Sequence, residues 1–382
     1  MKWFAVYACL SLLVSCSHSP RTTVSADPVQ TVLRLAPSVA NPRNSEGDFI
    51  RLKNGALLFV YTHFTAGAAD EATAHLAQRI SHDQGKTWSE DDVVLVAQEG
   101  GLNVMSVSLE RITPDTIGLF YLRKNSWQDC RPMLRLSGDE GQTWGTALAV
   151  FPQEDSSYYV MNNDRVVRMR DGRLLLPLAL HYAAGWSKWT GQAQILCAHS
   201  DDNGRTWSKG HYAPVAGSSE SKKVTLQEPG VVELKDRRLL LFCRTDAGSQ
   251  YIGYSNDRGE TWSALQPSNM ISPLSPATIE RIPQTGDLLL LWNNHERIDP
   301  ALKGKRTPFT AAVSQDEGQT WTNLKTIHDD PNGWYCYTAV EFVGDYVLLA
   351  YCAGDRRENN GLALTQISRL PLGFFYQPQA LR

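Results

Sequence analysis

The chain has 382 residues, of which 42% are hydrophobic and 20% are charged, and its formal net charge at pH 7 is -3. This length supports one large domain or two ordinary domains, each able to bury a sizeable core. Because the chain has no excess of basic residues, it lacks the electrostatic footprint of a nucleic-acid-binding protein. Anion binding would have to come from a local cluster of arginines.

The first residues form a targeting segment. Lys2 precedes an apolar run over residues 3–14, which is too short to span a bilayer and fits the core of a secretory signal. The run ends in Leu-Val-Ser-Cys16, which resembles the lipobox of bacterial lipoproteins, whose cysteine is lipidated. We expect a signal peptide at 1–16 and a polar tether at 17–30, unless Cys16 is an ordinary residue of a cleaved peptide. The next residue is not aspartate, which by the same resemblance favours an outer-membrane anchor on the periplasmic or surface face.

Five cysteines follow this segment, and they are Cys130, Cys197, Cys243, Cys336 and Cys352. Their odd number and the lack of a Cys-x-x-Cys spacing argue against a zinc site or a dense disulfide framework. Three of them lie in or beside apolar runs, so we expect buried free thiols.

Two series of repeats run through the rest of the chain. The pattern Ser-x-Asp-x-Gly-x-Thr-Trp occurs five times, beginning at Ser81, Ser137, Ser200, Ser255 and Ser314. A polar or Gly-containing turn leads into an apolar run six times, and these runs begin at Leu57, Ile117, Leu174, Leu239, Leu288 and Val347. Both series indicate units of roughly sixty residues.

Each unit has the character of β-structure. Turn signals bound apolar runs of four to six residues, and no long stretch keeps a helical period. Four strands in each of six units predict an all-β fold, a six-bladed β-propeller over residues 31–382. The last unit lacks its own Ser-x-Asp-x-Gly turn, and a strand at residues 31–35 is expected to complete it.

The repeated Ser-x-Asp-x-Gly pattern is interpreted as a structural turn. Its aspartate can accept hydrogen bonds from backbone N–H groups, its glycine supplies a positive φ, and its tryptophan packs the turn onto the unit. The alternative is calcium binding or catalysis by these aspartates, but none of the five loops has the alternating ligands and closing glutamate of a calcium loop.

These repeats are also the Asp boxes by which the chain resembles the sialidases (neuraminidases), over nearly the whole length after the targeting segment. The resemblance implies sialylated glycans as partners, no metal or organic cofactor, and a monomer. It also implies a particular chemistry. Because the substrate carries a carboxylate at its anomeric carbon, these enzymes use a tyrosine activated by glutamate as nucleophile. Arginines hold the carboxylate, and a further acid protonates the leaving oxygen.

Two stretches match the family's nucleophile and base. Tyr337-Thr-Ala-Val corresponds to the family's Tyr-Ser-x-Leu before a turn and an apolar strand, and implies Tyr337 as nucleophile, with Tyr335 as the neighbouring competitor. Glu228, just ahead of Val-Val-Glu-Leu, corresponds to the base that deprotonates the tyrosine. Arg244, after the next apolar strand, corresponds to one ligand of the sugar carboxylate.

Two further arginines complete the implied carboxylate site. Arg306 precedes the Asp box at Ser314 as an arginine does in the family, although a basic loop is the alternative. Arg43 stands near the place of the family's first arginine, but the usual Arg-Ile-Pro is absent. The family's Leu-Tyr-Glu, whose glutamate holds that arginine, has become Ala-Tyr-Cys at 350–352. We expect Glu46 to supply the lost carboxylate.

The acid is expected on the loop Ala-Gly-Ala-Ala-Asp70-Glu71. Asp70 best matches the family's aspartate ahead of the strand that leads into the first Asp box, with Glu71 as the alternative. A flexible loop that closes over the substrate would partly desolvate this acid.

Polar side chains also lie beside predicted inner strands, where unpaired burial is costly. Asn162, Asn163, Asp164 and Arg165 are expected either to bind the glycerol or N-acyl parts of the sugar or to make hydrogen bonds between units. Taken together, the sequence predicts an exported, lipid-anchored exo-sialidase. An exo-glycosidase for another acidic sugar and a non-catalytic glycan-binding propeller are the alternatives.

Overall fold

The computed structural model describes residue 1 and residues 27–217 and 223–377. The fold over these residues is all-β, with three 3-10 turns at Pro300–Leu302 (η1), Arg356–Glu358 (η2) and Leu372–Phe375 (η3). None of the helices in this part of the chain is long and apolar enough to cross a membrane. The predicted lipidation site Cys16 lies outside the described residues.

Four sheets have four antiparallel strands each. The first contains β2 (Arg43–Arg51), β3 (Leu57–Phe64), β4 (Ala74–Ser81) and β5 (Val93–Val96). The second contains β15 (Leu226–Glu233), β16 (Leu239–Thr245), β17 (Ser249–Ser255) and β18 (Gln266–Ile271). The third contains β19 (Thr278–Arg281), β20 (Leu288–Trp292), β21 (Phe309–Ser314) and β22 (Thr322–His328). The fourth has the order β1 (Gln30–Leu35), β25 (Thr365–Pro371), β24 (Tyr346–Asp355) and β23 (Gly333–Val343).

The remaining strands form one nine-stranded sheet. Its first part contains β6 (Asn103–Thr113), β7 (Thr116–Ser126), β8 (Asp129–Ser137) and β9 (Leu148–Ala149). Its second part contains β10 (Tyr158–Val160), β11 (Val167–Arg168), β12 (Leu174–Tyr182), β13 (Gln194–Ser200) and β14 (Ser208–Lys209). A single parallel bridge, between Tyr158 and Cys130, joins the two parts. The structure thus differs from the expected six four-stranded units, and the blade count stays a prediction.

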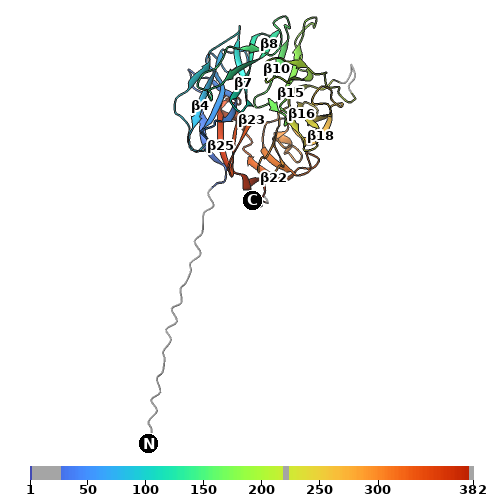
Figure 1. Cartoon of the computed structure of the whole chain (residues 1–382). Coiled ribbons are helices and arrows are strands. Elements are labelled where there is room, and N and C mark those ends of the chain that lie inside the picture. Colours follow the sequence, from blue (N-terminus) through green and yellow to red (C-terminus); the bar gives the residue numbers. More distant parts are fainter. Residues whose placement is uncertain (2–26, 218–222, 378–382) are drawn as a thin grey trace.

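The sheets follow one another around the molecule. In Figure 1 the colours pass from the blue strands through green and yellow to the red strands, so sheets that are consecutive in sequence lie side by side. The first strand, β1, belongs to the last sheet, where it pairs with β25 from Gln30↔Arg369 to Leu35↔Thr365. The predicted strand at 31–35 therefore does complete the last sheet.

The core lies between neighbouring sheets. All six predicted apolar runs are strands, and adjacent residues on them face different clusters. Leu57 packs in a cluster with Leu348 of β24, whereas Leu58 packs with Leu119 of β7. The same division separates Leu174 from Leu175, Leu239 from Leu240, Leu288 from Leu289, and Val347 from Leu348. Period-two alternation thus gives each of these strands two buried faces.

The Asp boxes are structural turns, as predicted. In the first box, Asp83 Oδ1 accepts hydrogen bonds from Ser81 Oγ and from the backbone N–H of Thr87, both at 2.9 Å. The Thr87 hydroxyl donates to the other oxygen of Asp83, and Gly85 has a φ of 79°. The same hydrogen bonds recur in the other four boxes. Because both carboxylate oxygens are engaged within the turn, these aspartates hold the hairpin rather than a ligand.

Candidate active site

A cavity of about 320 Å³ is lined by side chains from the edge strands of several sheets. Glu46 of β2, Ser106 of β6, Glu228 of β15 and Tyr337 of β23 all contribute to its wall. Each of these strands is the edge of its sheet. The cavity therefore gathers residues that are far apart in the sequence.

The same backbone feature aims these four side chains into the cavity. Each edge strand has a β-bulge at which two of its residues oppose one on the neighbouring strand. The first of these two residues is left-handed in every case, with φ of 54° at Glu46, 59° at Ser106, 51° at Glu228 and 57° at Tyr337. A left-handed non-glycine residue costs on the order of 1–3 kcal/mol and persists where the surroundings enforce it, which is typical of functional sites.

Tyr337 and Glu228 form the central contact of the cavity. The Tyr337 hydroxyl donates a hydrogen bond of 3.2 Å to Glu228 Oε1. Burial and the neighbouring Glu228 carboxylate raise the pKa of Tyr337 above its ordinary value, so the phenol is protonated at neutral pH. The competitor Tyr335 instead stacks with His328 in the core, with ring centroids 5.1 Å apart.

Arg244 and Arg306 flank this pair. Arg244 Nη1 lies 2.9 Å from Glu228 Oε2, and its other nitrogens donate to the side-chain oxygen of Gln227. The Arg306 guanidinium lies 5.4 Å from the centroid of the Tyr337 ring. Arg306 Nη1 also donates to Cys336 Sγ at 3.0 Å. Both arginines thus lie next to the tyrosine, and Arg244 but not Arg306 lines the cavity. Their role as ligands of the sugar carboxylate stays a prediction.

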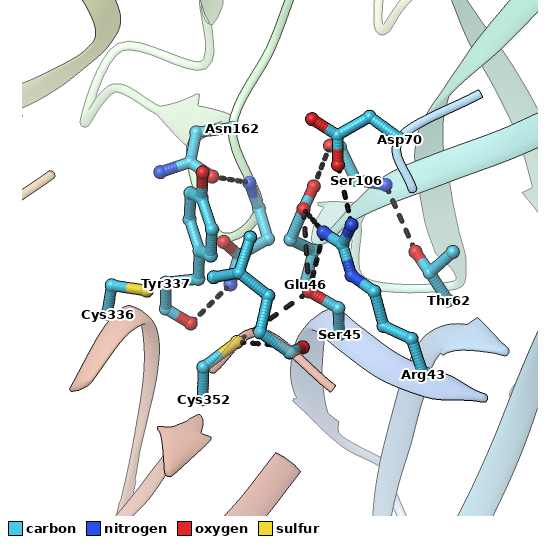
Figure 2. Close-up of polar contacts among 12 residues, drawn as sticks. Arg43, Ser45, Glu46, Thr62, Asp70, Ser106, Asn162, Cys336, Tyr337 and Cys352 are labelled. Carbon is cyan, nitrogen blue, oxygen red and sulfur yellow. Dashed lines mark hydrogen bonds and ion pairs between the residues drawn. The ribbon is translucent and has the colours of Figure 1, made fainter. Parts of the chain in front are cut away.

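Arg43 is the most enclosed of the three arginines, with 1% of its side chain exposed. Its Nη2 lies 2.9 Å from Glu46 Oε1, and its Nη1 lies 2.5 Å from Asp70 Oδ1 (Figure 2). In the family, the glutamate of Leu-Tyr-Glu holds this arginine, and residues 350–352 correspond to that motif here. In this chain the carboxylate beside Arg43 is that of Glu46. Cys352 contacts Ser45 instead, with 3.7 Å between Sγ and Oγ.

Glu46 is itself held in place. Its second carboxylate oxygen accepts a hydrogen bond from the Ser106 hydroxyl, whose residue belongs to the neighbouring sheet. Burial raises the pKa of Glu46, although Arg43 opposes this effect. The position of Arg43 is thus determined from two sheets.

Hydrogen bonds from neighbouring strands hold the loop that carries Asp70. Asn103 Nδ2 donates to the backbone oxygens of Asp70 and Ala72 at 2.9 and 2.7 Å, and Lys124 Nζ donates to the Asp70 backbone oxygen at 2.8 Å. Burial raises the pKa of the Asp70 carboxyl, but Arg43 outweighs it, so the pKa is lower than usual. Glu71, the alternative acid, is exposed and does not line the cavity.

Asn163, Asp164 and Arg165 do not line the cavity, so of the two expectations the structure favours hydrogen bonds between units. Asn163 Nδ2 donates to the backbone oxygens of Gly47 and Tyr337. Asp164 accepts from the N–H of Val340, and Arg165 donates to the oxygen of Ala277. These residues pair with other sheets, because they are enclosed where the edge strands converge.

One wall of the cavity was not found from the sequence. It is aromatic and consists of Trp127, Tyr158, His181 and Trp189, with Lys124 above two of the rings. His181 and Trp189 stack with centroids 4.7 Å apart, and burial lowers the pKa of His181 to about 4, so the ring is neutral at pH 7. Trp127 and Trp189 lie outside the repeated motifs. The only signal in the sequence was that each stands among polar residues in a loop.

A comparison with protein families identifies the class to which this repeated all-β fold belongs. The family of the BNR repeat-like domain matches residues 80–348. The chain belongs to this family and, through its curated relatives, to the sialidase superfamily.

The relatives are sialidases at low identity. The sialidase of Micromonospora viridifaciens is 27% identical over 334 residues, which cover 78% of this chain and 48% of that protein. The sialidase of Bacteroides fragilis is 24% identical over 323 residues, which cover 75% and 55%. This chain thus spans about half the length of the curated relatives it matches. A solved Hadza microbial sialidase has a TM-score of 0.69 at 17% identity, with 87% of this chain and 66% of that chain covered, and shares the fold.

Proposed function

We propose that the chain is a retaining exo-α-sialidase that removes terminal sialic acids from glycoconjugates. The observation that carries the proposal is the hydrogen bond of 3.2 Å between the Tyr337 hydroxyl and Glu228, on two left-handed residues facing one cavity. A phenol paired with a carboxylate suits a substrate whose own carboxylate would repel a carboxylate nucleophile.

In the first step, the Tyr337 oxygen bonds to the anomeric carbon while its proton passes to Glu228 Oε1. The bond from the anomeric carbon to the glycosidic oxygen breaks, and Asp70 gives that oxygen a proton. In the second step, Asp70 takes a proton from water as the water oxygen attacks the anomeric carbon. The tyrosine oxygen leaves and recovers its proton from Glu228, so two displacements retain the configuration.

The three arginines are proposed to hold the sugar carboxylate by charge-assisted hydrogen bonds. Arg244 and Arg306 flank Tyr337, whereas Arg43 is already paired with Asp70. A substrate carboxylate would compete with Asp70 for Arg43. The released Asp70 would then lose the charge that lowers its pKa and become a better proton donor.

We further infer that the packed sheets are the blades of a six-bladed propeller, with the nine-stranded sheet made of two blades joined by one bridge. Export, lipidation at Cys16, an outer-membrane location and a monomeric state complete the proposal. The sequence of the targeting segment supports the first three, and the monomeric state rests on the resemblance to the family.

The first test uses the full chain with sialyllactose and a panel of other acidic glycosides, and identifies the released monosaccharide by mass. Free sialic acid is expected from the parent protein. Tyr337→Phe should lose this activity because the nucleophilic oxygen is gone, while Tyr335→Phe, a neighbour in the core, should keep it. Release of another sugar would overturn the substrate, and binding without release from any glycoside would favour a non-catalytic propeller.

A further inference from the structure

Cys336 and Cys352 form a pair behind the cavity. They are directly opposite each other in the antiparallel ladder of β23 and β24, and both are buried. Cys336 immediately precedes Tyr337, and both cysteines are labelled beside it in Figure 2. Cys130, by contrast, lies in a separate core cluster, where burial raises the pKa of its thiol to about 12.

The ladder puts the two sulfurs within reach of a covalent bond. Opposite residues of an antiparallel pair have Cβ atoms roughly 4.5–5.5 Å apart. A disulfide needs about 3.5–4.5 Å between Cβ atoms and roughly 4.4–6.8 Å between Cα atoms. The register on the Cys336 side of the bulge is regular, from Gly333↔Asp355 to Cys336↔Cys352, so a small approach of the two strands suffices.

The surroundings give the two thiols different reactivity. Burial raises the pKa of Cys336, but a hydrogen bond with Cys352 and the charge of Arg306 outweigh it and lower the pKa to about 7. The same hydrogen bond and burial raise the pKa of Cys352. One sulfur is thus suited to attack as a thiolate, and the other is suited to resolve the product as its proton leaves.

Each sulfur is also connected to an arginine of the site, Cys336 directly to Arg306 and Cys352 to Arg43 through Ser45. Cys336 Sγ accepts a hydrogen bond of 3.0 Å from Arg306 Nη1. Cys352 Sγ lies 3.7 Å from Ser45 Oγ, which accepts a hydrogen bond of 3.3 Å from Arg43 Nη2. A change in the oxidation state of the pair would therefore act on both arginines.

We propose that Cys336 and Cys352 are a redox modification site, which forms a reversible cross-strand disulfide immediately before Tyr337 and thereby alters the partners of Arg306 and Arg43. The oxidant is a disulfide of low molecular weight, because both sulfurs are buried and a disulfide on another protein could not reach them.

The exchange proceeds in two balanced steps. The Cys336 thiolate attacks one sulfur of the oxidant, forms a mixed disulfide and releases the oxidant's other half as a thiolate. Cys352, as its proton leaves, attacks Cys336 Sγ and releases the second half. Counted from the dithiol, the protein loses two electrons and two protons, one of them on ionisation of Cys336, and the oxidant is reduced to two thiols.

The consequence for the cavity rests on the proposed function. In the dithiol form, a Cys336 thiolate can neutralise Arg306 at pH values above about 7. In the disulfide form the sulfur carries no charge, so Arg306 is available to an anionic ligand. Free sialic acid is therefore expected to bind the oxidised protein several-fold more tightly at pH 8, with a smaller difference at pH 6.

The test equilibrates the full chain in glutathione buffers of different redox ratio, starting from both the reduced and the oxidised protein. Non-reducing digestion and mass spectrometry then measure the peptide cross-linked through Cys336 and Cys352. We expect the cross-link from both starting states in oxidising buffers and its loss with a dithiol reductant. This readout does not depend on activity, so a failure of the proposed function leaves it unchanged.

Matched variants separate this pair from the other thiols. Cys352→Ser should stop the reaction at a mixed disulfide of glutathione on Cys336, whereas Cys130→Ser should leave the cross-link unchanged. The absence of the cross-link in every buffer would overturn the proposal. So would accumulation of the mixed disulfide in the parent protein, because Cys352 would then fail to resolve it.

Discussion

Asp70 lies 2.5 Å from Arg43, and this ion pair keeps the pKa of the carboxyl below its ordinary value. A general acid needs the opposite condition, since it must hold its proton until the leaving oxygen takes it. These two conditions are compatible if the substrate carboxylate replaces Asp70 as the partner of Arg43. In the proposed mechanism the anion that binds Arg43 is the substrate's own carboxylate, so Asp70 would become a competent acid only after that carboxylate has bound.

We predict that Asp70→Asn slows turnover by an amount that depends on the leaving group. Turnover of sialyllactose should fall by roughly 10²–10⁴-fold, because the leaving sugar needs a proton. An aryl sialoside, whose phenolate leaves without one, should lose much less. Kinetics with both substrates measure the difference, and Glu71→Gln on the same loop is the control.

The same variant has a second readout. The neutral amide that replaces the Asp70 carboxylate would no longer neutralise Arg43, so free sialic acid should bind at least as tightly as it binds the parent protein. Equal losses on both substrates, or a large loss of sialic acid affinity, would contradict the role given to Asp70.

At the scale of the element, the edge strands and the Asp boxes have separate tasks. The bulges at Glu46, Ser106, Glu228 and Tyr337 aim polar groups into one cavity. The boxes close the hairpins by hydrogen bonds within each turn. Left-handed non-glycine residues occur in both, because the residue before the glycine of every box also has a positive φ, so the bulges and the turns differ in what they hold rather than in backbone strain.

The boxes predict a particular dependence on acid. The Thr206 hydroxyl and the hydrogen bonds around it lower the pKa of Asp202 to about 2. Its stabilising effect is therefore full above the unfolded-state pKa of about 4 and is lost as pH falls from there to about 2. Asp202→Asn should lower the melting temperature at pH 7 by on the order of one or two degrees and reduce its further fall between pH 4 and pH 2.

Thermal unfolding at several pH values tests this prediction, with Asp91→Asn at an exposed position as the control. Because the turn is remote from the cavity, kcat should remain unchanged. An acid limb identical to that of the parent protein would contradict the assignment of the stabilisation to this carboxylate.

The sequence was informative where a local pattern determines the structure. The five boxes and the six apolar runs are local, and the structure has the predicted turns and strands at these positions. The family's spacing placed Tyr337 beside Glu228 and Arg244 because these residues follow the same repeats. The left-handed bulges and the aromatic wall could not be predicted, because they depend on how edge strands from different sheets converge.

Asn163, Asp164 and Arg165 illustrate the same limit. Their residue types suited either a sugar or another strand, and only the convergence of the sheets decides which surface they meet. Cys352 was correctly expected to be buried, but its position opposite Cys336 depends on the register of β23 and β24.

At the scale of the whole molecule, a second cavity of about 440 Å³ lies further along the converging strands. It gathers the carboxyl groups of Asp48, Glu110, Asp164, Glu280 and Glu341 with the arginines Arg51, Arg111 and Arg168. Burial raises the pKa of Glu110 to about 7 and that of Glu341 to about 7. Carboxyl groups from several sheets are thus held where their ionisation is unfavourable.

These two glutamates predict a pH dependence opposite to that of the boxes. Between about pH 4.5 and pH 7 the folded state binds more protons than the unfolded state, so stability falls as pH rises through this window. The double variant Glu110→Gln and Glu341→Gln should flatten this fall. Melting temperatures from pH 4 to pH 8 measure the slope, and an unchanged slope in the double variant would refute the assignment.

The pairing of β1 with β25 links the first described strand to the last. A pull on the chain ahead of Gln30 would load this ladder first, at the Gln30↔Arg369 end, before any other sheet bears force. The ladder would then open pair by pair toward Leu35 and expose the edge of β25, while the other sheets keep all their strands. The mechanical resistance of the molecule to such a pull is therefore determined at the seam where its two ends meet.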